Sequence, residues 1–288
     1  MSETEAAAPT AGPEPEPSRQ EQRAEAKRHR ARRGQAIAVA SSVIVLGGLA
    51  ALAYTSPGWD DVSKTFFSWQ AFSESFPDVL RGFWLDVRIF LFVEVAVLIL
   101  GLGIALLRTI DAPALFPLRL LAIVYTDLFR GFPVILLVYL IGFGVPALQL
   151  SGLPTDKVVL GGLALTLAYS AYVAEVYRAG LRSVHRGQRD AALAIGLTER
   201  QSLRYVVIPQ AVRRVGPPLL NDFISLQKDV ALVAILGPQE AYRIATITAA
   251  SDFNYTPLLA AALLYLLITV PLARLLDRWD ANAGGVTR

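Results

Sequence analysis

The chain has 288 residues, of which 54% are hydrophobic and 18% are charged, and its formal net charge is +3. Soluble domains are about 45–50% apolar and about a quarter charged, so this composition is typical of a membrane protein. The absence of cysteine excludes disulfides, thiolate metal sites and cysteine nucleophiles. The two histidines, His29 and His185, lie in arginine-rich stretches without the partners that a metal site or a catalytic triad requires. We therefore expect no metal, no cofactor and no catalytic residue.

Residues 1–34 are predicted to form a disordered, basic cytoplasmic tail. Up to Pro17 the tail is rich in Ala, Pro and Glu, which bury too little apolar surface to fold. From Arg19 to Arg33 it becomes basic, and contact with anionic lipid headgroups is expected there.

The uncharged run from Ile37 to Tyr54 predicts an extra N-terminal transmembrane helix at residues 35–55. At ~1.5 Å per residue it is just long enough to cross a ~30 Å hydrocarbon core. A cleaved signal peptide is the alternative, because basic residues precede the run and Ala51-Leu52-Ala53 resembles a cleavage site.

Five further apolar segments follow, which makes the chain an all-α membrane protein with about six transmembrane helices. They are Ile89–Leu107, interrupted only by Glu94, then Phe132–Leu150, Val158–Ala174, the charge-containing Val206–Leu236, and Phe253–Ala273. The amphipathic stretch Leu115–Phe129 is expected at the cytoplasmic interface, before Gly131-Phe132-Pro133 turns the chain into the bilayer. Pro217-Pro218 is expected to break the helix of the charge-containing segment.

The arginines predict the orientation of these helices. With the basic tail in the cytoplasm, residues 56–83 form an acidic extracytoplasmic loop, and residues 279–288 form a cytoplasmic tail. The arginine clusters near the membrane boundaries then all lie in the cytoplasm, as the positive-inside rule requires: Arg108, Arg119, Arg178, Arg182, Arg186, Arg189, Arg200, Arg204, Arg274 and Arg278. We interpret the positive charge as a topology signal and not as a nucleic-acid-binding surface.

The cytoplasmic loop at residues 178–209 is too patterned to be a passive connection. Gln188–Ile195 is predicted to be a short helix with Asp190 in its first turn, where the helix dipole favours a negative charge. Gly196 is expected to cap this helix, and Thr198 and Gln201 have capping-box spacing for a second one. Such a helix–glycine–helix unit suits the groove of a partner protein. An interfacial helix pair without a partner is the alternative.

The motifs of this loop resemble the EAA loop of ABC importer permeases. Asp190-Ala191-Ala192, Gly196 and Ile208-Pro209 match that motif in order and spacing. The segments YVAEVYRAG (172–180) and LQKDVAL (226–232), with the element from Arg130 to Pro133, resemble the polar-amino-acid branch, of the histidine, glutamine and glutamate uptake type. The resemblance covers residues 81–277. Three residues depart from it, because Asp190 replaces the usual glutamate and Val230-Ala231 stands where Thr-Ser is common.

The resemblance implies a permease domain at residues 84–278, with a five-helix core, that works with several partners. These are cytoplasmic ATPase subunits, a second permease copy or a related permease, and an extracytoplasmic amino-acid-binding protein. The residues implied in ATPase docking are Asp190, Ala191, Ala192, Gly196, Ile208 and Pro209. The chain itself has no P-loop, because none of its four lysines follows a glycine. If transport is ATP-driven, another chain must therefore supply the ATPase, and the resemblance implies a transport subunit in a bacterial inner membrane and not an enzyme.

Candidate substrate-path residues are the polar side chains inside the predicted spans: Glu94, Arg130, Asn221, Asp222 and Lys228. A charge at membrane depth is costly unless it faces a polar cavity or a partner. Glu94 is therefore expected either to contact a substrate ammonium group or to pair with an arginine. Lys228 is expected either to line the path or to pair with Asp222 or Asp229. An ion-coupled secondary carrier or channel using Glu94 or Asp222 is the competing function.

Overall fold

The computed structural model describes residues 19–110 and 112–284, and these are almost entirely helical. They form two units, residues 1–62 and 63–288, which we describe separately. The first contains α1 (Arg19–Tyr54), whose side chains from Arg33 to Tyr54 are all exposed. The predicted disorder of residues 19–34 is therefore wrong, since α1 begins at Arg19, whereas residues 1–18 lie outside the described range.

The second unit is built around α3 (Trp69–Thr109) and α7 (Lys157–Ser183), which pack against each other. The short helix α2 (Trp59–Phe66) precedes α3. A buried cluster that includes Val97, Ala168 and Val233 joins α3 and α7 to α5 (Val134–Tyr139), α10 (Ile208–Asp229) and the 3-10 turn η4 (Val230–Leu236). A second cluster packs α11 (Ala241–Asp252) and α12 (Thr256–Gly284) on the first half of α3.

Between α3 and α7 the chain bends sharply. The 3-10 turn η1 (Pro113–Leu115) and α4 (Phe116–Gly131) are followed by α5, the π-turn η2 (Leu140–Gly144) and α6 (Val145–Ala147). The two helical arms meet at 105°, with extended backbone at Phe132. The turn predicted at Gly131-Phe132-Pro133 is confirmed.

Within the described residues, four helical segments are long and apolar enough to cross a membrane, and the bent pair makes up to five. They are Arg33–Tyr54, Trp59–Thr109, Lys157–Ser183, Thr256–Trp279, and the pair Pro113–Gly131 with Val134–Ala147. The predicted fifth span, Val206–Leu236, is helical along its length, but its charges keep it outside this group.

Two sequence predictions about helix extent are wrong. Residues 69–83, expected to belong to a loop, are the first turns of α3, because Val79 and Phe83 are buried there against α11 and α12. Pro217-Pro218 does not break α10, which continues through both prolines to Asp229.

Gly82 is required for the packing of α3 against α11. A Cβ atom at this position would lie 2.7 Å from the carbonyl carbon of Glu240 and 2.8 Å from the nitrogen of Ala241, and backbone cannot yield as a side chain can. We predict that Gly82→Ala lowers the free energy of unfolding by about 1–3 kcal/mol.

Gly103, on the same helix, is the matched control because a Cβ atom there meets nothing within 4 Å. Gly103→Ala is expected to be neutral or stabilising by up to about 1 kcal/mol, because alanine favours helix more than glycine does. Thermal melting of both variants in detergent checks the pair, and equal melting temperatures would contradict the role given to Gly82.

Candidate functional site: the α8–α9 loop and the Glu175 cluster

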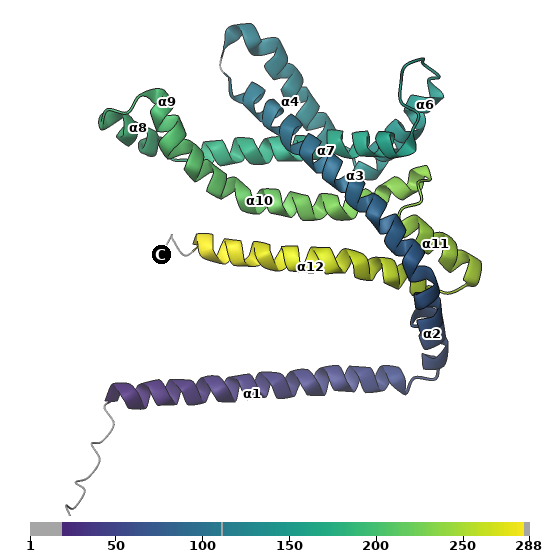
Figure 1. Cartoon of the computed structure of the whole chain (residues 1–288). Coiled ribbons are helices and arrows are strands. Elements are labelled where there is room, and N and C mark those ends of the chain that lie inside the picture. Colours follow the sequence, from purple (N-terminus) through teal and green to yellow (C-terminus); the bar gives the residue numbers. More distant parts are fainter. Residues whose placement is uncertain (1–18, 111, 285–288) are drawn as a thin grey trace, which may run out of the picture. The chain divides into compact units, whose positions relative to one another are not determined.

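The loop between α7 and α10 folds into α8 (Arg186–Ala194), α9 (Glu199–Ser202) and the π-turn η3 (Leu203–Val207). Figure 1 shows α8 and α9 at the end of the second unit where α10 begins. The α8 helix starts two residues earlier than predicted, because His185 Nδ1 caps it by accepting a hydrogen bond from the Gly187 nitrogen at 3.1 Å. Asp190 therefore lies beyond the first turn, so the dipole argument for its position was wrong.

The turn between α8 and α9 agrees with the sequence prediction. Gly196 has φ +90°, a left-handed conformation that glycine adopts most readily, and its nitrogen bonds to the Leu193 carbonyl at 3.0 Å. The Thr198 hydroxyl accepts from the Gln201 nitrogen at 3.3 Å, and the Gln201 side chain accepts from the Thr198 nitrogen at 2.9 Å. The capping box is confirmed, so both ends of the turn are fixed by local chemistry.

The predicted docking residues are not all on one face of this loop. Asp190, Ala191 and Gly196 are exposed, whereas Ala192 is only 4% exposed and packs inward. Ala192, which the resemblance implies in docking, therefore packs against the chain itself and offers little surface to a partner. Ile195, which is 80% exposed, stands beside Gly196 and is the large apolar side chain of the outer face.

Several polar contacts hold the loop against the helices on either side. Arg189 on α8 forms two hydrogen bonds with Glu199 on α9, at 2.6 and 2.9 Å. Gln210 on α10 approaches Gln188 at 3.5 Å, and the Arg214 guanidinium donates to the Ser183 carbonyl at the end of α7. Ile208 and Pro209 are the first two residues of α10, directly after η3. These contacts connect α8 to α9 and to the start of α10, and they connect α10 to the end of α7.

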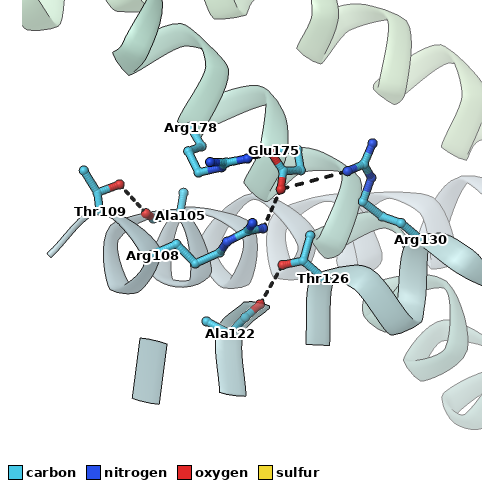
Figure 2. Close-up of polar contacts among 8 residues, drawn as sticks. All are labelled: Ala105, Arg108, Thr109, Ala122, Thr126, Arg130, Glu175 and Arg178. Carbon is cyan, nitrogen blue, oxygen red and sulfur yellow. Dashed lines mark hydrogen bonds and ion pairs between the residues drawn. The ribbon is translucent and has the colours of Figure 1, made fainter. Parts of the chain in front are cut away.

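A single carboxylate, that of Glu175, collects three arginines from three helices (Figure 2). Arg108, at the end of α3, approaches it at 2.5 Å, and Arg178, one turn further along α7, donates twice, at 2.7 and 3.0 Å. Arg130, at the end of α4, lies at 3.9 Å and also covers the ring of Tyr172. We call these four residues the Glu175 cluster.

Sequence analysis missed the role of Glu175. The available signal was a carboxylate directly after the uncharged run Val158–Ala174, with an arginine three residues later. The strongest partner, Arg108, is 67 residues away in sequence, so only the fold reveals the contact.

A cavity of about 430 Å³ adjoins this cluster, and two of the predicted path residues line it. Arg130 and Asp222 lie in its wall together with Tyr172, Glu175 and Arg214. Asp222 Oδ2 is buried and accepts no hydrogen bond from the described residues. Glu94 lies within electrostatic range of Asp222. The fold therefore brings Glu94, Arg130 and Asp222 together from α3, α4 and α10.

Asn221 and Lys228 lie elsewhere on α10 and are exposed. Among the described residues Lys228 forms no ion pair with Asp222 or Asp229. Asp229 instead accepts a hydrogen bond from the Tyr169 hydroxyl at 2.8 Å. The intramolecular lysine pair that the sequence left open is absent from the part of the chain that the structure describes.

The model of one protein family, described as "Binding-protein-dependent transport system inner membrane component", matches residues 98–283. The "Arginine transport system permease protein ArtQ" of Bacillus subtilis is 32% identical over 195 residues, covering 67% of this chain and 87% of that protein. The "Glutamine transport system permease protein GlnP" of Escherichia coli is 30% identical over 215 residues, covering 74% and 96%.

Solved structures show the same fold. An amino acid ABC transporter with histidines matches with a TM-score of 0.67 at 29% identity, over 75% of this chain and 98% of that one. The methionine transporter MetNI matches with a TM-score of 0.57 at 20% identity, over 73% and 96%, which is a likeness of fold.

Proposed function

Because this chain belongs to the family of inner-membrane components of binding-protein-dependent transport systems and is the permease subunit of an amino-acid ABC importer, we propose that a separate ATPase docks on its α8–α9 loop. The chain is a transport subunit and not an enzyme. ATP hydrolysis takes place on the partner, and the docked α8 transmits the motion of that partner to α7 and α10.

The observation behind this proposal is the outer face of the loop. Asp190, Ala191, Ile195 and Gly196 are exposed together, although Ile195 is a large apolar residue. The capping contacts and the Arg189–Glu199 pair fix the backbone beneath them. A fixed apolar projection beside small residues and one carboxylate fits a groove in a partner protein. Ala192 packs beneath this face, whereas Ile208 and Pro209, which are exposed, belong to the docking surface and anchor the loop to α10.

We extend the proposal to the remaining partners and to the orientation of the chain in the membrane. The transporter contains a second copy of this chain or a related permease, and an extracytoplasmic binding protein delivers the amino acid. The chain lies in a bacterial inner membrane with both termini in the cytoplasm. Residues 35–55 form an extra helix outside the permease domain of residues 84–278.

The substrate is a polar amino acid, and its path includes Glu94, Arg130, Asn221, Asp222 and Lys228. Two observations support this choice. Asp222 has a buried oxygen without a hydrogen-bond donor, and Lys228 has no carboxylate partner within the described residues. A substrate ammonium group and a substrate carboxylate would supply the missing partners.

Asp190→Arg tests the docking surface. We expect the variant to lose most substrate-stimulated ATP hydrolysis and uptake in liposomes that contain this chain, its ATPase and its binding protein. The change replaces a carboxylate with a cation at the contact with the partner's groove. A groove that attracts the carboxylate repels the new arginine, and like-charge contacts at an interface cost several kcal/mol. Hydrolysis and uptake are measured together against the wild-type complex.

Asp127→Arg is the control, because Asp127 is an exposed carboxylate on α4 with the same change of charge outside the loop. It should keep both activities. Equal losses in the two variants would rule out a specific docking role for Asp190. Uptake that proceeds without ATP would favour the ion-coupled carrier, and Glu94 and Asp222 would then be tested as coupling groups.

A further inference from the structure

A second, larger cavity lies behind the loop, on the side of α8 that faces the end of α7. Its volume is about 890 Å³, and α7, α8, α9 and η3 all contribute to its wall. The lining residues are of two kinds, basic and apolar, with one carboxylate among them. The basic and acidic ones are Arg182, His185, Arg186, Arg189, Arg200 and Glu199.

The charge of this cavity is not neutralised from within. Glu199 is paired with Arg189 at 2.6 Å. Arg182, Arg186 and Arg200 form no ion pair among the described residues, although they come from three different helices to one cavity. Orientation of the chain in the membrane requires basic residues at this end, but it does not require them to converge. Converging guanidinium groups match the oxygens of a phosphate, which they bind with charge-assisted hydrogen bonds.

The other part of the wall is apolar. Leu181, Val184, Leu203 and Val207 line it, and Leu203 is 48% exposed. Free phosphate is hydrated on all sides and gains nothing from such a surface. A phospholipid has a charged phosphate joined to apolar acyl chains. The phosphate can therefore contact the basic part of the wall while the acyl chains contact the apolar part.

We propose that this cavity, the basic cavity behind α8, binds the headgroup phosphate of an anionic phospholipid. The position agrees with the chemistry, because Arg182 is in the last turn of α7, where a membrane-crossing helix reaches the headgroup layer. The bound lipid bridges α7, α8 and α9 through Arg182, Arg186 and Arg200. The α8–α9 loop therefore rests on lipid on its inner side, independently of what docks on its outer face.

Binding of fluorescent phosphatidylglycerol to the purified full-length chain in detergent tests this proposal. The double variant Arg182→Gln/Arg200→Gln is expected to bind it about 25-fold more weakly, because each basic residue near an anionic surface contributes about a fivefold factor. Arg182→Lys/Arg200→Lys keeps the charges and should stay within about threefold of wild type. Phosphatidylcholine should bind weakly to all three proteins, and millimolar inorganic phosphate should not displace the labelled lipid.

The matched control is Arg204→Gln/Arg274→Gln, which removes the same charge outside the lining of the cavity, and it should bind like wild type. An equal loss in this control would show a diffuse basic surface and overturn the site. Displacement by inorganic phosphate would overturn the assignment to lipid, and equal affinity for phosphatidylcholine would overturn the role of charge. If the first variant does not fold, loss of binding in the lysine variant would also contradict the proposal. None of these readouts uses the ATPase, so they are independent of the docking experiment.

Discussion

Glu175→Gln is expected to lower the free energy of unfolding by about 3 kcal/mol, a large effect for a change of one atom type. The Arg108 side chain is only 9% exposed and that of Arg178 is 23% exposed, and both depend on this carboxylate. Glutamine keeps the shape and one acceptor oxygen but removes the charge, which leaves a buried guanidinium uncompensated. Thermal melting in detergent should show a decrease of about 6–10 °C.

Arg130→Gln is the control for this prediction. Arg130 reaches the same carboxylate at 3.9 Å, and its side chain is 44% exposed. Exposed ion pairs contribute about 0–1 kcal/mol, so this variant should melt within about 3 °C of wild type. If Arg130→Gln is as destabilised as Glu175→Gln, the cluster acts through its total charge and not through the buried Arg108–Glu175 contact.

The parts of the loop that were predicted correctly depend on local chemistry. The left-handed glycine at 196 and the Thr198–Gln201 capping box need only residues within three positions of each other, so the sequence shows them directly. The bend at Gly131-Phe132-Pro133 belongs to the same class, because a proline restricts the residue before it.

The predictions that were wrong or missing depend on tertiary contacts. The acidic stretch at residues 56–83 resembled a loop, but burial of Val79 and Phe83 against α11 and α12 makes residues 69–83 the first turns of α3. Ala192 belongs to the motif implied in docking, yet the packing of α8 turns its side chain inward. The prolines at 217 and 218 each remove one backbone donor, and packing of α10 against α7 and α12 keeps the helix intact.

The family resemblance and the fold agree on the permease, whereas the position of the proposed path residues could not be predicted from the periodicity of the sequence. Glu94, Arg130 and Asp222 are separated by long stretches of sequence and converge only because α3, α4 and α10 pack around α7. Asp222 Oδ2, a buried oxygen without a hydrogen-bond donor among the described residues, is the observation at this point that a substrate ammonium group would explain.

Lys228→Gln is expected to raise the KM for amino-acid uptake about 10–100-fold while leaving ATP hydrolysis without substrate unchanged. Lys228 is exposed in the last turn of α10 and has no ion-pair partner within the described residues. A cation in a membrane protein is costly unless it has a function, and hydrogen bonds to charged groups contribute about 1.5–3 kcal/mol. If the substrate carboxylate is the partner, removal of the charge weakens binding by that amount.

Lys157→Gln is the matched control for Lys228. The Lys157 ammonium donates to the Gly142 carbonyl at 2.9 Å and lies over the ring of Phe143, so its contacts are structural. This variant should lower the melting temperature and leave the KM unchanged. Lys228→Gln should instead raise the KM and leave the melting temperature unchanged. A lower kcat at unchanged KM for Lys228→Gln would place the lysine in the conformational cycle and remove it from the substrate path. The split between KM and kcat therefore separates a group that touches the amino acid from one that only moves with α10.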